Sequence, residues 1–213
     1  MIIEDRLTSY INSLDMGNTP FLDELEAFAL ETEVPIIRKD MQTFLKMFLA
    51  MKKPENILEI GTAIGFSALL MAEYNPGECH ITTIENYDKR IVLAKENIKK
   101  AGKEDVITLM EGDALGILPT LTGKYDFIFS DAAKGQYVNY LPDIKRMLKK
   151  GGVLISDNIL QDGDLIESRF AVVRRNRTIH KRMREYVYML THDEELRTSL
   201  LPVGDGITVS VKL

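Results

Sequence analysis

The sequence of 213 residues is poor in cysteine and has no long apolar run. Its single cysteine, Cys79, excludes an internal disulfide framework and a cysteine-rich zinc site, which fits a reducing compartment. No apolar run approaches the roughly 20 residues of a membrane span, so we expect no membrane contact. Residues 1–10 carry acids early and lack the apolar core of a signal peptide, so we expect a cytoplasmic protein.

The length suits one α/β domain with a substantial core and leaves little room for two. The composition, 45% hydrophobic and 28% charged, is ordinary for a globular protein. No repeat, low-complexity segment or Pro/Gly-rich linker divides the chain. We therefore expect a single domain over residues 1–213, with a helical extension in residues 1–50 and the core in residues 51–213.

The first fifty residues have the apolar spacing of helices. A first helix is predicted from the spacing of Ile3, Leu7, Tyr10, Ile11 and Leu14. A second is predicted over residues 22–31, and Asp40 is expected to cap a third. The apolar side of that third helix consists of Met41, Phe44, Leu45, Phe48 and Leu49. These helices could cover the active site or supply a homodimer interface.

From residue 56 onward, short apolar runs alternate with helical stretches. The expected strands are residues 56–60, 80–85, 106–110, 125–131 and 151–157. The helices between them should begin near Gly65, Tyr87, Ala114 and Tyr137. This alternation predicts a parallel sheet with helices on both faces, because parallel strands need crossover connections.

Two further runs, residues 197–203 and 206–213, meet at Gly204-Asp205-Gly206. Glycines at this spacing indicate a hairpin, so the last strand should run antiparallel to the others. The predicted fold class is therefore α/β: a Rossmann-like, doubly wound, seven-stranded and mostly parallel sheet with an antiparallel last strand, preceded by N-terminal helices.

Ligands of such sheets bind beyond the carboxyl ends of the strands. The loop after the first strand has its glycines at Gly61 and Gly65, a spacing unlike the G-x-G-x-x-G of dinucleotide folds; it could be a cofactor loop or an ordinary tight turn. Glu85 ends the second strand, where an acid could accept ribose hydroxyls or simply be solvated. Asp113, after the third strand, could bond an adenine, cap the next helix, or do both.

The fourth and fifth strands end in acids. Asp131 is followed by Lys134, and Asp157 is followed by Asn158. Neighbouring strands would bring these side chains together, and two carboxylates with a carboxamide suit a hard divalent ion such as Mg²⁺. The alternative is that the acids cap helices or bind loops.

Together, the motifs EIGTAIGFS, EGDAL, YDFIFSDAAKGQY, GGVLISDN and LPVGDGIT resemble the metal-dependent O-methyltransferases related to catechol and caffeoyl-coenzyme A O-methyltransferases. The resemblance runs from about Met41 to the end of the chain. Ala63 stands where many other methyltransferases have glycine, as is common in this branch. The resemblance implies S-adenosylmethionine as cofactor, Mg²⁺ or Mn²⁺ as metal, and a homodimer.

The resemblance also implies a role for individual residues. The S-adenosylmethionine site would consist of Met41, Gly61, Ser67, Glu85, Asp113, Ala114 and Asp131. The divalent ion would be held by Asp131, Asp157 and Asn158. Lys134 would match the lysine that acts as base in catechol methyltransferases, and Asp131 would be the second catalytic residue. The metal would chelate two adjacent substrate oxygens and lower the pKa of the hydroxyl that is methylated.

Residues 169–184 contain seven Lys or Arg and no acid, although the formal net charge of the chain is -5. A helix there would have one basic face and one apolar face, formed by Ile179, Met183, Tyr186, Val187 and Leu190. The basic side chains could be an ordinary solvated face or a phosphate-contacting surface. The candidates for RNA contact are Arg174, Arg175, Arg177 and Arg182.

The basic segment, the length and the N-terminal helices are similar to a bacterial branch that methylates 5-hydroxyuridine at the tRNA wobble position. We therefore expect the anticodon arm of tRNA as acceptor, since an unpaired base is accessible without melting a duplex. The alternative acceptor is a small catechol or caffeoyl-type phenol, which needs an apolar pocket and no phosphate clamp. A catalytically silent nucleotide-binding module fits less well, because it has no need of a metal, and the loop spacing disfavours a dehydrogenase.

Overall fold

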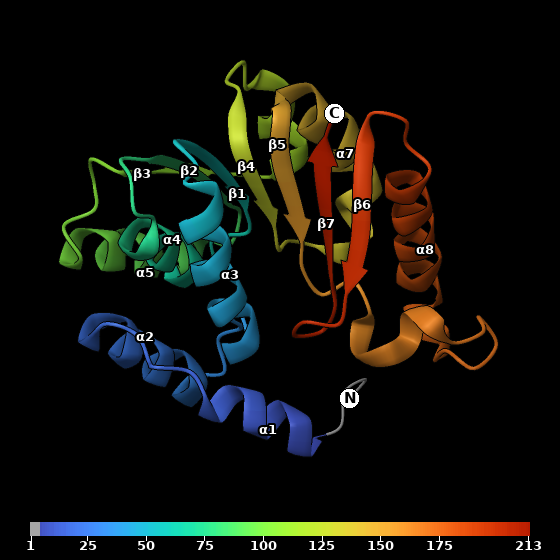
Figure 1. Ribbon diagram of the computed structural model, residues 1–213, viewed down its shortest axis with the longest axis horizontal. Coiled ribbons are helices and arrows are strands. Elements are labelled where there is room, and N and C mark those ends of the chain that lie inside the picture. The colour runs from blue at the N-terminus through green and yellow to red at the C-terminus, as the bar shows by residue number, and fades with distance from the viewer. Residues whose placement is uncertain (1–4) are drawn as a thin grey trace.

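The computed structural model describes residues 5–213 and is built around one central sheet (Figure 1). Within these residues the sheet has seven strands in the order β3-β2-β1-β4-β5-β7-β6. The strands are β1 Asn56–Ile60, β2 His80–Glu85, β3 Ile107–Glu111, β4 Tyr125–Ser130, β5 Leu148–Ser156, β6 Leu196–Leu201 and β7 Ile207–Lys212. Strand order reverses between β1 and β4, which is where ligands bind in open sheets of this kind.

Strands β1 to β5 are parallel, and β7 pairs antiparallel with both β5 and β6. The expected Rossmann-like, mostly parallel sheet with an antiparallel last strand is therefore confirmed. In β4, Phe127 and Phe129 face one side of the sheet and Ile128 faces the other, as the two-residue repeat of a strand requires. Both sides are buried, which explains the continuous apolar run.

Two helical layers cover the sheet (Figure 1). The first layer consists of α3 Lys39–Lys52, α4 Phe66–Tyr74 and α5 Asp88–Lys100, and α2 Pro20–Glu31 packs against α4 beyond it. The second layer consists of α6 Ala114–Ile117, α7 Tyr137–Met147 and α8 Arg177–Thr191. Short 3₁₀ turns lie between these elements: η1 Leu118–Thr120, η2 Lys134–Gln136, η3 Gln161–Ile166 and η4 Arg174–Asn176. The four helix starts predicted between the strands agree with the structure to within one residue, whereas α2 begins two residues before its predicted start.

The first N-terminal helix forms as predicted, whereas the predicted cap of the third does not. The apolar residues Leu7, Tyr10 and Ile11 of helix α1 (Asp5–Ser13), and Leu14 just after it, are 40–63% exposed, and Ile3 lies outside the described residues. The prediction that Asp40 caps α3 is wrong, because Arg38 is the N-cap residue and makes no side-chain cap. Asp40 instead accepts a hydrogen bond from the Gly204 amide at 2.7 Å, which ties α3 to the β6–β7 turn.

Helix α8 buries a face close to the predicted one. Met183, Tyr186 and Leu190 are buried, whereas Ile179 is 37% exposed and His180 is buried beside it. None of the helices among residues 5–213 is long and apolar enough to cross a membrane.

Candidate active site

A cavity of about 620 Å³ opens at the carboxyl ends of β1, β2, β4 and β5. Parallel strands place the residues that follow them at one edge of the sheet, which is why segments distant in sequence meet here. The cavity is lined by each predicted cofactor, metal and base residue: Met41, Gly61, Ser67, Glu85, Asp113, Ala114, Asp131, Lys134, Asp157 and Asn158. Their grouping in one cavity leaves their individual roles as predictions.

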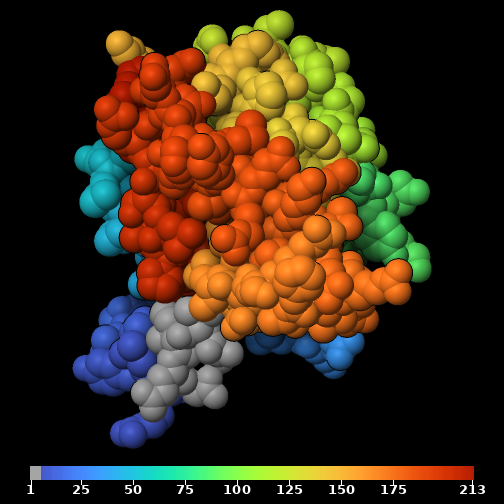
Figure 2. All heavy atoms as spheres, turned by 90° about the vertical axis from the view of Figure 1, so that its right-hand side faces the viewer, coloured from blue at the N-terminus to red at the C-terminus, as the bar shows by residue number. Residues whose placement is uncertain are grey.

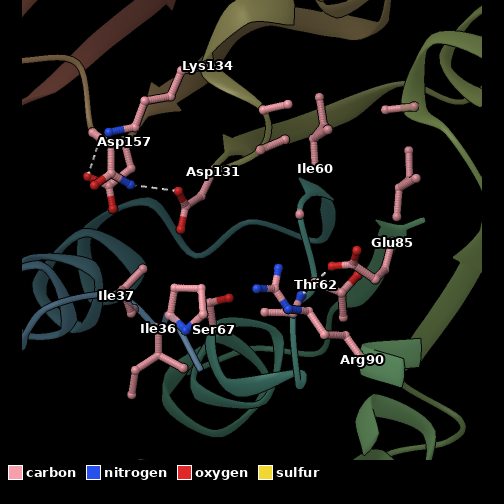
Figure 3. A pocket seen from close by; sticks show the side chains of 18 of the residues that line it. Ile36, Ile37, Ile60, Thr62, Ser67, Glu85, Arg90, Asp131, Lys134 and Asp157 are labelled. Carbon is pink, nitrogen blue, oxygen red and sulfur yellow. Dashed lines mark hydrogen bonds between the residues drawn. The ribbon is translucent and has the colours of Figure 1, made fainter. Parts of the chain in front are cut away.

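Glu85 lies at one end of the cavity, with Arg90 near it (Figure 3). The Ala63 amide donates to Glu85 Oε2 at 2.8 Å, and the amides of Asn86 and Tyr87 donate to Oε1 at 3.0 Å. Glu85 is buried, so the alternative of a solvated acid is wrong. Its carboxylate is fixed by backbone donors and faces the cavity, as an acceptor for sugar hydroxyls would be.

Asp113 caps helix α6, since its side chain accepts a hydrogen bond from the Leu115 amide at 3.0 Å. The capping alternative is thus confirmed. Asp113 also lines the cavity, so one residue could serve both purposes, and its contact with adenine stays a prediction.

Gly61 allows the loop after β1 to pass close to the end of β4. Its φ of +103° lies in the region that favours glycine, and a Cβ there would collide with the backbone carbonyl of Asp131. Because of this close approach, the loop that approaches Glu85 and the segment that carries Asp131 lie against one another.

The candidate cation site lies at the other end of the cavity (Figure 3). Asn158 Nδ2 donates to Asp131 Oδ1 at 2.7 Å, and the Asn158 amide donates to Asp157 Oδ1 at 2.6 Å. Asn158 has a φ of +57°, a conformation that asparagine tolerates better than most residues. The three oxygen-bearing side chains therefore meet as the sequence predicted.

Electrostatics make this corner suitable for a cation. Burial raises the pKa of both Asp131 and Asp157, and the charge of Asp131 raises that of Asp157 further. Two buried carboxylates side by side are costly unless a positive charge compensates them. Residues 5–213 contain no group of three or more His, Cys, Asp or Glu that could hold a metal, so the candidate set is two carboxylates and one amide. Oxygen donors of this kind fit Mg²⁺ or Mn²⁺.

Lys134 also points toward this corner (Figure 3). Its Nζ lies 3.6 Å from Asp205 Oδ2 in the β6–β7 turn. Asp205 is buried, and its Oδ1 accepts a hydrogen bond from the Asp162 amide at 2.6 Å. Sequence reasoning treated Asp205 only as a turn residue, although it stands in the motif LPVGDGIT. Arg38 and Arg90 also line the cavity, but no sequence motif marks them, because only the fold brings them there.

Glu59, a buried acid near the end of β1, is another residue that sequence reasoning missed. Its Oε2 accepts a hydrogen bond from Thr83 Oγ1, which is also bonded to Thr62 Oγ1, each at 2.5 Å. Burial raises the pKa of Glu59 to about 7, and the charges of Asp131 and Glu85 add to this effect. The Glu59–Thr83–Thr62 network links β1 and β2 to the loop that lines the cavity.

The four candidate RNA-binding arginines lie outside the cavity lining. Figure 2 shows the face that carries them, with α8 and the orange segment before it on the surface. Arg174, Arg175 and Arg182 are exposed, whereas Arg177 is half-buried and donates to the Val172 carbonyl at 3.1 Å. Arg182 donates to the carbonyl of Gly135 at 2.7 Å, and Gly135 is the residue that follows Lys134. The structure therefore brings one of the four close to the cavity.

Comparison with known proteins agrees with this geometry. The family model described as O-methyltransferase matches residues 12–213. Caffeoyl-CoA O-methyltransferase of Medicago sativa is 34% identical over 177 residues, which is 80% of this chain and 72% of the relative. Caffeoyl-CoA O-methyltransferase 1 of Eucalyptus globulus is 35% identical over 176 residues, which is 80% of this chain and 72% of the relative.

Solved structures agree as well. A Staphylococcus aureus structure, whose name assigns it provisionally to the caffeoyl-CoA O-methyltransferases, has a TM-score of 0.90 and 31% identity, and the match covers 98% of this chain and 100% of that one. An SAH-bound methyltransferase of Podospora anserina has a TM-score of 0.88 and 28% identity, covering 98% and 94%. The chain therefore belongs to the O-methyltransferase family of the caffeoyl-CoA O-methyltransferase type, and it is an S-adenosylmethionine-dependent enzyme.

Proposed function

We propose that the protein methylates one hydroxyl of an adjacent oxygen pair with the help of a divalent cation, and that the acceptor is a catechol-like or caffeoyl-type phenol. The observation that supports this proposal is the meeting of Asp131, Asp157 and Asn158 beside Lys134, in the cavity whose other end holds Glu85. The named relatives favour a phenol as the acceptor.

Residues at different places in the cavity bind the donor, hold the cation and handle the proton. Glu85 holds S-adenosylmethionine by the ribose of that cofactor. The methyl group then faces the end of the cavity that contains Asp131 and Lys134. A divalent cation held by Asp131, Asp157 and Asn158 would supply chelation of two adjacent oxygens and a lower pKa for the acceptor hydroxyl. Lys134 takes the proton of the acceptor hydroxyl, and the ammonium group that results stabilises the oxyanion that remains. The oxygen forms a bond to the methyl carbon as the sulfur–carbon bond breaks, and S-adenosylhomocysteine leaves.

The cation is tested by Asp157→Ala. This variant should lose turnover of catechol or caffeoyl-CoA while it keeps its affinity for S-adenosylhomocysteine, because Glu85 and the loop near it are untouched. Isothermal titration calorimetry and a labelled-methyl assay measure the two quantities. Wild-type enzyme treated with EDTA should behave in the same way and recover with Mg²⁺ or Mn²⁺. Full activity of Asp157→Ala in EDTA would rule out the metal mechanism.

The second candidate acceptor is 5-hydroxyuridine at the tRNA wobble position. Its C5 hydroxyl lies next to the C4 carbonyl, an oxygen pair like that of a catechol. The observation in its favour is the basic segment 169–184, in which Arg174 and Arg175 are exposed and Arg182 contacts Gly135. Phe170 is 86% exposed in the same segment, and aromatic side chains can stack on unpaired bases.

The two acceptors are separated by one assay with labelled S-adenosylmethionine. Caffeoyl-CoA and catechol are compared with tRNA that carries 5-hydroxyuridine. If RNA is the acceptor, Arg174→Ala/Arg175→Ala raises KM for tRNA, whereas Lys99→Ala/Lys100→Ala, an equally exposed basic pair on α5, does not. Unchanged 5-methoxyuridine in the tRNA of cells that lack this protein would exclude the tRNA role.

A further inference from the structure

Tyr137 lies beneath the two strand ends that carry Asp131 and Asp157. It is the first residue of α7 and only 1% exposed. Its hydroxyl oxygen lies 3.0 Å from the Ser130 carbonyl and 3.2 Å from the Asp157 carbonyl, so its single proton can be shared between the two in a bifurcated hydrogen bond. One phenol group thus bridges β4 and the residue after β5.

This bridge lies just beyond the end of regular pairing. The β4–β5 register ends at Ser130↔Ser156, after which the Asp131 amide donates to Ile60 of β1 and the Asp157 amide donates to Ser130. The Asp157 amide therefore still links β5 to β4, and the Ser130 carbonyl accepts from both this amide and the Tyr137 hydroxyl. The contact of the Tyr137 hydroxyl with the Asp157 carbonyl adds a second link between the two strand ends.

The ring itself is held in place by a second buried tyrosine. Tyr186 of α8 packs against it edge to face, with ring centroids 5.2 Å apart and an interplanar angle of 65°. The Tyr186 hydroxyl is bonded to Ser156 Oγ at 2.7 Å.

We propose that Tyr137 is a positioning residue of the cation site and that its hydroxyl sets the spacing of the Asp131 and Asp157 carboxylates. The inference rests on the proposed function, because it takes these carboxylates to be cation ligands. Mg²⁺ demands near-ideal octahedral geometry at about 2.0–2.1 Å, so a small change in the spacing of two ligands weakens binding. Groups that orient ligands commonly affect metal affinity by about 10–100-fold.

The test is Mn²⁺ binding by Tyr137→Phe, measured by electron paramagnetic resonance of free Mn²⁺ without methyl acceptor. The change removes one oxygen and keeps the ring that packs on Tyr186. The expected result is a Kd for Mn²⁺ raised about tenfold, with unchanged affinity for S-adenosylhomocysteine. Tyr186→Phe is the matched control, since it removes the hydroxyl of the packed partner and should leave the Kd for Mn²⁺ unchanged. The rise in Tm that Mn²⁺ causes is a second measure of Mn²⁺ binding, and it reports only on protein that is folded.

Each outcome decides one question. Wild-type affinity in Tyr137→Phe overturns the role of Tyr137 and leaves the metal mechanism in place. Equal losses in the two variants also overturn it, because they would reflect the packing of the pair. Absence of Mn²⁺ binding by the wild-type protein overturns the metal part of the proposed function, and the role of Tyr137 with it.

Discussion

The contact between Lys134 and Asp205 predicts that Asp205 affects kcat through Lys134. Asp205 is buried and lies 3.6 Å from Lys134 Nζ, so its charge helps to hold the ammonium group in the cavity. Asp205→Asn keeps the oxygen that accepts from Asp162 and loses the charge. We expect kcat to fall about tenfold, equivalent to about 1.4 kcal/mol, with little change in KM for S-adenosylmethionine.

A double-mutant cycle checks this expectation. If Asp205 acts through Lys134, Asp205→Asn should have little further effect in a Lys134→Ala background. Additive losses in kcat would show instead that Asp205 acts independently, for example by holding the Asp162 loop. Asp126→Asn, which removes the charge of another carboxylate that pairs with a lysine, Lys149, is the control and should leave kcat unchanged.

Glu59 gives a prediction about pH and stability. Its pKa rises from 4.5 to about 7 on folding because it is buried. Between these values the folded state binds more protons than the unfolded state, so the contribution of Glu59 to stability falls as pH rises through this window. Glu59→Gln removes the titration, and its Tm relative to wild type should therefore increase from pH 5 to pH 8.

Differential scanning calorimetry at several pH values measures that difference. For a chain of this size, 1 kcal/mol corresponds to about 2–4 °C in Tm, so the change should be resolved. Thr83→Val is a useful comparison, because it removes the donor to Glu59 and leaves the carboxyl group. A Tm difference between Glu59→Gln and wild type that does not vary with pH would contradict the prediction.

At the scale of elements, the sequence predicted what depends on local pattern. The run Phe127–Phe129 is apolar because both faces of its strand are buried, and the residues after such strands had to share one edge of the sheet. The partners of Asp40 and Asp205 could not be predicted in this way. Asp40 contacts Gly204, which is 164 residues away, and a short acid at a helix start is by local rules a cap.

The tight packing of the loop between β1 and α4 predicts that one added methyl group at Gly61 prevents cofactor binding. Gly61→Ala would place a Cβ against the Asp131 carbonyl in a backbone conformation that alanine rarely adopts. We expect loss of S-adenosylhomocysteine binding, because the loop and the end of β4 must separate. Gly77→Ala is the control, since a Cβ there meets nothing within 4 Å and should leave binding unchanged. Calorimetric titration of both variants measures the effect, and normal affinity in Gly61→Ala would contradict the close approach.

The distribution of charge over the whole molecule bears on the choice of acceptor. The formal net charge is -5, yet residues 169–184 carry seven basic side chains and no acid, so the rest of the chain, with 20 bases and 32 acids, is acidic. Such a protein repels a polyanion except at that segment. A small neutral phenol would be nearly indifferent to this asymmetry.

Salt dependence therefore separates tRNA from a neutral catechol as the acceptor. If the four arginines each contact one phosphate of a single-stranded RNA loop, counterion release should weaken tRNA binding about 50-fold between 50 and 200 mM salt. Filter binding of tRNA over this range gives the slope, and Arg174→Ala/Arg175→Ala should reduce it, whereas Lys99→Ala/Lys100→Ala should not. KM for a neutral catechol should stay nearly constant over the same range. A flat salt response with tRNA would mean that the basic segment does not bind phosphates, and the phenol would then stand as the acceptor.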